Sequence, residues 1–322
     1  MSKRKRVNYK KVVIAIFLIL IATCVGVFLI IKNNPKLYNE ISEKTDIQPE
    51  NNVIENKEEK QEDISIHLNN LKDDESSFGN LDVPVYKINE KNIKVPILIY
   101  HGFSTPMLSN EDDPYKLMCS EDLFEDQITT LKEAGYTFIT LEDMYKYKQG
   151  KIGLPEKNIT ITMDDGWLGN YTEAFNIIKQ YNVPATIFIV EDLVGTEGYF
   201  DWEQAKEMYD SGLVKIHVHG RHHKDATGYS NEQLISDYNH THSLIEEKLD
   251  AKIQKIMAYP AGKSDTNTIK TLKEAGFEVQ VQTKYGTVNK STSLDLTGLG
   301  RIRAEKASGD SILKTINNAT VN

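Results

Sequence analysis

Two neighbouring carboxylates, Asp164 and Asp165, follow a short apolar run of the sequence and precede Gly166. Asp and Gly suit the backbone dihedrals of tight turns, so this triplet alone is compatible with an ordinary turn. Paired carboxylates can also divide the work of a hydrolytic site, because one can take a proton while the other binds a metal ion. Which interpretation holds depends on what the fold brings to the same place.

A second segment with chemical potential is rich in histidine, since positions 217–223 hold four of the eight histidines in the chain. Together with a carboxylate, two imidazoles complete a ligand set for a first-row metal that leaves positions open for water. His219 and His223 would present both rings on one side if the loop turns helically. His217 and His219 form a competing pair at strand spacing. The spacing leaves both pairs open, and a solvated loop is the alternative to both.

Strands and helices are expected to alternate from Ile93 onward. Short β-branched runs bounded by Gly, Pro or polar residues are typical of buried strands, and the stretches between them are amphipathic. The expected strands are 97–100, 138–141, 159–163, 185–190, 213–218, 256–259 and 279–283. The expected helices are 122–134, 171–180, 203–211, 232–249 and 268–275. This alternation indicates an α/β fold in which a parallel sheet closes into a (β/α) barrel or partial barrel.

One short sequence recurs at two expected helix ends. Residues 131–136 read Leu-Lys-Glu-Ala-Gly-Tyr, and residues 272–277 repeat them with Phe in the last position. Gly is common directly after a helix because it adopts left-handed dihedrals without strain. The repeat predicts that one helix-to-strand connection is used twice, not that a whole domain is duplicated.

Polar motifs fall at the carboxyl ends of four expected strands. His101, Asp164 and His219 each follow a strand, and Tyr259 ends another. In a (β/α) barrel these strand ends all open on one face, where active sites are built. We therefore expect the four motifs to converge in space.

The N-terminal part of the chain reads as a membrane anchor. Residues 12–31 carry no charge and no proline, and they follow a basic segment, 1–11. An apolar helix of this length spans a bilayer core, at about 1.5 Å per residue against roughly 30 Å. The basic flank places the N-terminus in the cytoplasm and everything after the span outside the cell. A cleaved signal peptide is the alternative, although no small-residue cleavage site follows.

Composition completes the expected organisation. Residues 32–92 are rich in Asn, Glu, Lys, Asp and Ser, which predicts a flexible extracellular linker before a catalytic domain, 93–322. The formal net charge of −9 argues against nucleic-acid binding. Cys24 lies in the apolar segment, so Cys119 has no partner for a disulfide within the expected domain. Nothing in the sequence implies a protein partner.

Taken together, the motifs resemble the polysaccharide deacetylase family, also known as the NodB-homology domain or carbohydrate esterase family 4. The resemblance is carried by 159–167, Ile-Thr-Ile-Thr-Met-Asp-Asp-Gly-Trp, preceded by Leu154-Pro155, and by 184–188, Pro-Ala-Thr-Ile-Phe. It covers roughly 97–303 and is greatest to the branch that deacetylates poly-N-acetylglucosamine or peptidoglycan. It implies a distorted (β/α) barrel.

The resemblance also implies a role for each matching residue. Asp164 matches the general base, and Asp165 matches the carboxylate ligand of one divalent metal ion. His219 and His223 match the two histidine ligands, so the resemblance favours this pair. Zinc is the first expectation for the metal, and the same ligands accept cobalt, nickel or iron.

Substrate contacts and the acid follow from the same resemblance. Contacts to the substrate or its oxyanion are implied for Trp167, Tyr259, Pro260 and Ala261, with the backbone N–H of Ala261 facing the oxyanion. Many members take their general acid from a C-terminal Leu-x-His, and this chain has no histidine in that region. In the poly-N-acetylglucosamine branch a Tyr-His near the start of the domain supplies the acid. His101 occupies that position, and a structural histidine is the alternative.

The expected function is metal-dependent hydrolysis of N-acetyl groups on N-acetylglucosamine units of an extracellular polysaccharide. Peptidoglycan is preferred because the expected anchor and linker hold the domain at the cell wall, and a poly-β-1,6-N-acetylglucosamine exopolysaccharide is the alternative. An O-acetyl ester hydrolase would use the same residues. A catalytically inactive glycan-binding ectodomain is a further alternative, which the presence of both the base and the full ligand set disfavours.

Overall fold

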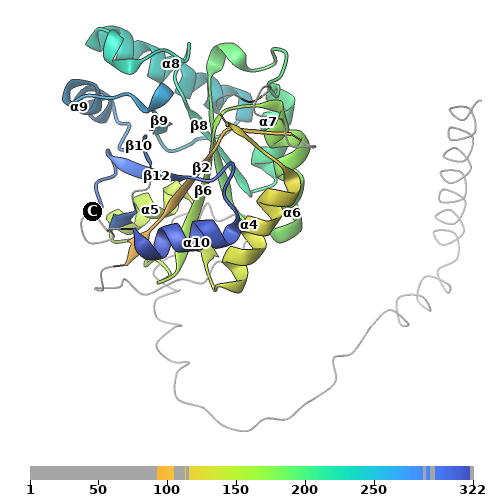
Figure 1. Cartoon of the computed structure of the whole chain (residues 1–322). Coiled ribbons are helices and arrows are strands. Elements are labelled where there is room, and N and C mark those ends of the chain that lie inside the picture. The colour runs from red at the N-terminus through yellow and green to blue at the C-terminus, as the bar shows by residue number, and fades with distance from the viewer. Residues whose placement is uncertain (1–92, 105–112, 114–115, 286–287, 291–293, 320–322) are drawn as a thin grey trace, which may run out of the picture. The chain divides into compact units, whose positions relative to one another are not determined.

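Seven parallel strands close into a barrel within the described part of the chain (Figure 1). In the computed structural model they follow the order β2-β12-β10-β9-β8-β7-β6, and pairing of β2 with β6 closes the ring. Their bounds are β2 (Ile97–Tyr100), β6 (Asn158–Asp165), β7 (Ala185–Ile189), β8 (Val214–Val218), β9 (Ile256–Ala258), β10 (Val279–Tyr285) and β12 (Leu299–Arg303). The structure describes residues 93–319 except 105–112, 114–115, 286–287 and 291–293. All of them belong to one compact unit of the chain, 75–322.

Helices surround the barrel (Figure 1), which confirms the expected (β/α) architecture. They are α4 (Glu121–Glu133), α5 (Leu141–Lys148), α6 (Phe175–Tyr181), α7 (Trp202–Asp210), α8 (Asn231–Leu249), α9 (Thr266–Glu274) and α10 (Gly309–Asn318). Short helical turns are η1 (Asn170–Ala174), η2 (Glu191–Leu193), η3 (Ala226–Gly228) and η4 (Pro260–Gly262). The strands outside the closed ring are β1 (Lys94–Val95), β3 (Gly102–Phe103), β4 (Met118–Cys119), β5 (Thr137–Phe138) and β11 (Asn289–Lys290).

Apolar side chains fill two layers, because successive residues of a strand point to opposite faces of the sheet. On β7, Ile187 and Ile189 pack in the layer between strands and helices, whereas Phe188 belongs to the inner cluster. Helix α5 contributes Leu141 and Met144 to that inner cluster. The strands are therefore buried on both faces, which explains why they read as continuous β-branched runs in the sequence.

The repeated helix-to-strand connection is confirmed. Helices α4 and α9 both end just before a Gly in the left-handed region, Gly135 at φ 82° and Gly276 at φ 94°. In both copies, 131–136 and 272–277, the aromatic N–H donates to the Leu carbonyl five residues earlier at 2.9 Å. Two six-residue segments that differ only in their last residue therefore form the same helix end, one in each half of the sequence.

Some expected elements differ from the observed ones. The expected strand 138–141 ends early because Thr140 and Asp143 form a reciprocal capping box that starts α5. Strand β12 and helix α10 were not expected at all. No helix within the described ranges is long and apolar enough to cross a membrane. The expected basic tail 1–11, anchor 12–31 and linker 32–92 lie outside the described residues.

Candidate active site

Three of the expected motifs converge at the carboxyl ends of the barrel strands. Asp164 and Asp165 end β6, and His219 follows β8 directly. Nε2 of His219 lies 3.3 Å from Oδ1 of Asp165 and 3.9 Å from Oδ2 of Asp164. His101 follows β2, and its ring is close enough to influence the pKa of both carboxyls. The strand-end argument therefore predicted this cluster.

Asp165, His219 and His223 form a group whose side chains could share one cation. Nε2 of His223 also lies 3.3 Å from Oδ1 of Asp165, and the three candidate ligand atoms lie within 4.8 Å of one another. Oδ1 of Asp165 is buried without a hydrogen-bond partner, while Oδ2 accepts from Nε1 of Trp167 at 3.1 Å. Nδ1 of His219 is engaged with the carbonyl of Ala258 at 2.9 Å, which directs Nε2 toward Asp165. This donor set fits a divalent metal ion.

Local backbone and charge hold Asp165 in this arrangement. Its φ of 77° is left-handed, which is uncommon for a non-glycine residue and turns the chain sharply at the end of β6. Burial alone would raise the pKa of the Asp165 carboxyl, but the imidazoles of His219 and His223, each 3.3 Å from Oδ1, hold that pKa below its usual value. Burial alone would lower the pKa of His219, but the facing Asp164, together with Asp165 and the carbonyl of Ala258, raises that pKa above its usual value.

Asp164 is fixed by an arginine that the sequence motifs did not single out. Nη1 and Nη2 of Arg301 donate to its two carboxylate oxygens at 2.7 Å each. The guanidinium is fully buried, and its Nε donates to the carbonyl of Gln282 at 3.1 Å. Burial alone would raise the pKa of Asp164, but the charge and hydrogen bonds of Arg301, together with the nearby His219, lower that pKa below its usual value. Asp164 is thus held ionised and in one orientation.

His101 is held from two sides. Its Nδ1 lies 2.7 Å from Oε1 of Glu305, a carboxylate that is only 1% exposed. Its backbone carbonyl accepts from the side chain of Asn170 at 2.7 Å. A carboxylate at Nδ1 favours the proton on that nitrogen, which leaves Nε2 available to the site. Asn170 begins the π-helical turn η1, where the sequence pattern predicted an ordinary helix. Such turns are frequent at functional sites.

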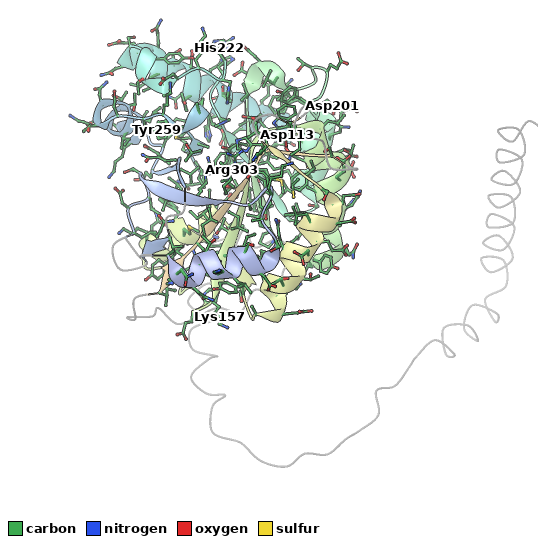
Figure 2. All side chains as sticks on the ribbon, in the orientation of Figure 1. Asp113, Lys157, Asp201, His222, Tyr259 and Arg303 are labelled. Atoms are coloured by element: carbon green, nitrogen blue, oxygen red, sulfur yellow. The ribbon has the colours of Figure 1, made fainter. Side chains whose placement is uncertain are left out.

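Tyr259 needs a correction, because its hydroxyl does not belong to the strand-end cluster. The side chain is fully buried, and its hydroxyl donates to Oε1 of Gln280 at 2.6 Å. It lies on the side of the barrel that α8 and α9 cover (Figure 2). The hydroxyl of Tyr259 is therefore no candidate for the site, whereas its backbone atoms and the residues that follow it remain candidates. Pro260 and Ala261 form η4, and Ala261 has a left-handed φ of 53°.

The competing pair of histidines is not assembled. His217 is 1% exposed, and its Nε2 lies 2.7 Å from Oε1 of Glu142 on α5, not against Asp165. His222 lies 2.5 Å from Asp192 through its Nδ1. Of the four clustered histidines, only His219 and His223 face the carboxylate of Asp165.

An aromatic pair borders the cluster. The ring of Trp167 stacks on that of Tyr199 with a centroid distance of 4.9 Å and an interplanar angle of 29°. Their backbones form an isolated antiparallel bridge, and both side chains are only partly buried. Asp165 raises the pKa of Tyr199, although burial of the phenol contributes more. An aromatic surface thus lies beside the carboxylate.

Comparisons with known proteins agree with this fold. A family model described as polysaccharide deacetylase matches residues 151–280. A poly-β-1,6-N-acetyl-D-glucosamine N-deacetylase of Staphylococcus aureus is 32% identical over 181 residues, covering 52% of this chain and 59% of that enzyme. The structure of the Streptococcus pyogenes deacetylase PplD with acetate superposes with a TM-score of 0.64 at 25% identity, covering 70% of this chain and 99% of that one. IcaB from Ammonifex degensii gives a TM-score of 0.59 at 25% identity, with 70% and 97% covered.

The chain is thus similar to polysaccharide deacetylases in both sequence and fold. The match to the staphylococcal enzyme spans 59% of that protein's length.

Proposed function

We propose that this chain hydrolyses N-acetyl groups from N-acetylglucosamine units of an extracellular glycan, releasing acetate and leaving a free amine. The observation that carries the proposal is the pairing of Asp164 with Arg301 beside the Asp165–His219–His223 group. An ionised carboxylate of fixed orientation lies next to a cation-binding set, as hydrolysis of an unreactive amide requires.

The side chains divide the reaction between them. Asp164 accepts a proton from the attacking water as the water oxygen bonds to the acetyl carbon. His101 then donates a proton to the amide nitrogen as the C–N bond breaks, with Glu305 holding its ring. A divalent cation held by Asp165, His219 and His223 would polarise the carbonyl and lower the pKa of the water, with zinc as the first expectation. The net change is one water consumed, with acetate and an amine formed.

Two further groups are assigned to the substrate. The exposed edges of Trp167 and its stacked neighbour Tyr199 offer an apolar surface for a sugar ring beside the reacting atoms. The backbone N–H of Ala261, in the turn after β9, is the proposed donor to the oxyanion. Both assignments depend on the substrate entering over the carboxyl ends of the strands.

Two glycans are candidate substrates. Peptidoglycan follows from the anchor expected at 12–31, which would tether the domain outside the cell membrane and at the wall. A poly-β-1,6-N-acetylglucosamine chain is favoured by the similarity to the staphylococcal N-deacetylase of that polymer. Both contain the same acetamide group, so one mechanism serves both.

Acetate release by the purified chain tests the proposal. Peptidoglycan, β-1,6-linked N-acetylglucosamine oligomers and an O-acetylated xylan would be compared with zinc or cobalt present and after chelation. Release from an amide substrate that requires metal and is lost in Asp164→Asn is the expected result. Release from the xylan alone would identify an esterase, and binding without turnover would identify a glycan-binding module.

A further inference from the structure

The two histidines that face Asp165 are held in different ways. His219 is 2% exposed, and its second ring nitrogen is engaged with a backbone carbonyl. His223 has a side chain that is 42% exposed, and its contact with Asp165 is made through Nε2. Its backbone adopts a left-handed φ of 50°, which costs energy for a residue with a Cβ. The position of this ring therefore depends on how the loop 220–223 is held.

Backbone hydrogen bonds tie the start of this loop to the turn η2. The N–H of Glu191 donates to the carbonyl of Gly220 at 3.3 Å, and the N–H of Asp192 donates to the carbonyl of Arg221 at 3.0 Å. Gly220 is itself left-handed, at φ 80°. Two left-handed positions thus lie within four residues, of which only His223 carries a Cβ, and η2 supplies the surface against which they are ordered.

Side chains make the second part of the attachment. The imidazole of His222 lies between two carboxylates, with Nδ1 2.5 Å from Oδ2 of Asp192 and Nε2 3.9 Å from Oδ2 of Asp237 on α8. His222 therefore connects the loop both to η2 and to α8, at the end of the molecule where α8 lies (Figure 2). The two ring nitrogens of an imidazole point in different directions, so one ring can contact carboxylates on two separate elements.

Glu191 anchors the turn that receives the loop. Its Oε1 lies 3.3 Å from Nε of Arg221 and 3.1 Å from Nε2 of His240, and its Oε2 accepts from the hydroxyl of Thr241 at 2.7 Å. His240 and Thr241 both belong to α8, a helix of 19 residues. The turn η2 is thus fixed to a long helix, and the loop is fixed to the turn.

We propose that His222, together with Asp192 and Asp237, positions His223 as a metal ligand. This bridge of three side chains, the His222 bridge, compensates for the strained backbone and the missing burial of His223. The inference rests on the proposed metal site. It adds positioning residues that neither bind the cation nor touch the substrate.

Zinc affinity of purified variants of the full chain tests the bridge. His222→Ala removes both contacts, whereas His222→Asn keeps an N–H near the place of Nδ1 and so keeps the contact with Asp192. We expect His222→Ala to weaken zinc binding by about tenfold or more, as loss of groups that orient metal ligands does. His222→Asn should stay within about threefold of the unmodified chain, because the donor to Asp192 remains. Competition with a chromophoric chelator measures these affinities.

Two controls separate positioning from general damage. Lys270→Ala removes an exposed ion pair with Glu274 on α9 and should leave zinc affinity unchanged. Melting temperatures without metal should agree within about 2 °C for His222→Ala and the unmodified chain, because partly exposed pairs contribute little to stability. The visible spectrum of the cobalt-loaded chain should change in His222→Ala, since the ligand geometry around the ion changes.

The outcomes distinguish this inference from the proposed function. An unmodified chain that binds no zinc, or whose affinity survives His223→Ala, overturns the metal site and with it the bridge. Zinc binding that depends on His223 but is equally tight in His222→Ala overturns the bridge alone. Equal losses in His222→Ala and His222→Asn would also contradict it, because Asn restores the contact with Asp192.

Discussion

Arg301 and Asp164 face each other through two parallel hydrogen bonds of 2.7 Å, with 0% and 2% of their side chains exposed. Pairs of this kind are costly to bury and costly to break, because removing one partner leaves an uncompensated charge in the interior. The pair is therefore easier to explain by the orientation that it gives the Asp164 carboxylate than by a gain in stability. The geometry also predicts how each partner responds to substitution.

Arg301→Lys should keep a positive charge but lose the two-pronged contact, since an ammonium group cannot bind both oxygens in one plane. We expect kcat to fall by about 10²-fold from misorientation of Asp164. Arg301 lowers the pKa of Asp164, so its weaker replacement should move the acidic limb of the pH–rate profile to higher pH. Acetate release measured from pH 4 to 9 checks both effects. An unshifted acidic limb would show that Asp164 is not the group that titrates.

Asp164→Asn and Asp165→Asn should have different phenotypes, although the residues are neighbours. Loss of a general base costs typically about 10²- to 10⁴-fold in rate, and Asp164→Asn should retain zinc affinity. Asp165→Asn should lose zinc affinity, because a neutral amide replaces the carboxylate ligand. Parallel zinc titrations and rate measurements check this separation. Equal zinc affinities in the two variants would refute the division of roles.

Glu305→Ala should slow turnover without changing zinc binding, because Glu305 contacts the ring of His101 and not the Asp165–His219–His223 group. If His101 supplies the proton to the amine, the loss should approach that of His101→Ala, within the range of about 10² to 10⁴ for a general acid. Steady-state rates of both variants, compared with Glu278→Ala as a surface carboxylate control, measure this effect. Full turnover in His101→Ala would assign that histidine a structural role.

Glu142→Leu should destabilise the fold by about 1–3 kcal/mol, because it leaves the buried His217 without its carboxylate partner. The same substitution should leave zinc affinity unchanged. Burial alone would raise the pKa of Glu142, but the contact with His217, aided by Lys215, lowers that pKa below its usual value. A carboxyl whose pKa is lower in the folded state than in the unfolded state stabilises the fold at pH values above its unfolded-state pKa. This stabilisation is lost as the pH falls through the folded-state pKa. Urea unfolding of the variant should therefore vary less between pH 5 and pH 3 than that of the unmodified chain.

The local sequence pattern was sufficient to predict the barrel and the residues at the ends of its strands. Runs such as 185–190 and 213–218 are apolar on both faces, which is a property of buried parallel strands that the sequence shows directly. His101, Asp165 and His219 then follow from chain direction alone. The alternation of side chains along β9 would also have placed Tyr259 outside, on the same face as Met257, because the two are two residues apart.

The partners of these residues could not be derived in the same way. Arg301 interrupts an apolar pattern, so its segment did not read as a strand, and its contact with Asp164 spans 137 residues of sequence. A barrel does require a strand between β10 and β2, and this requirement is the signal that could have found β12. Asn170 is hidden for another reason, since a π-helical turn differs from an α-helix by one hydrogen-bond step and leaves the apolar spacing almost unchanged.

The left-handed dihedral of Asp165 has a consequence for how the site tolerates motion. Asp164 and Asp165 are joined by one peptide bond, so the offset between the proton acceptor and the carboxylate ligand is set by covalent geometry and a few backbone torsions. His219 follows β8, and the loop that carries His223 is tied to η2 and α8. The offset between Asp164 and Asp165 is therefore fixed more tightly than the offset between Asp165 and either histidine.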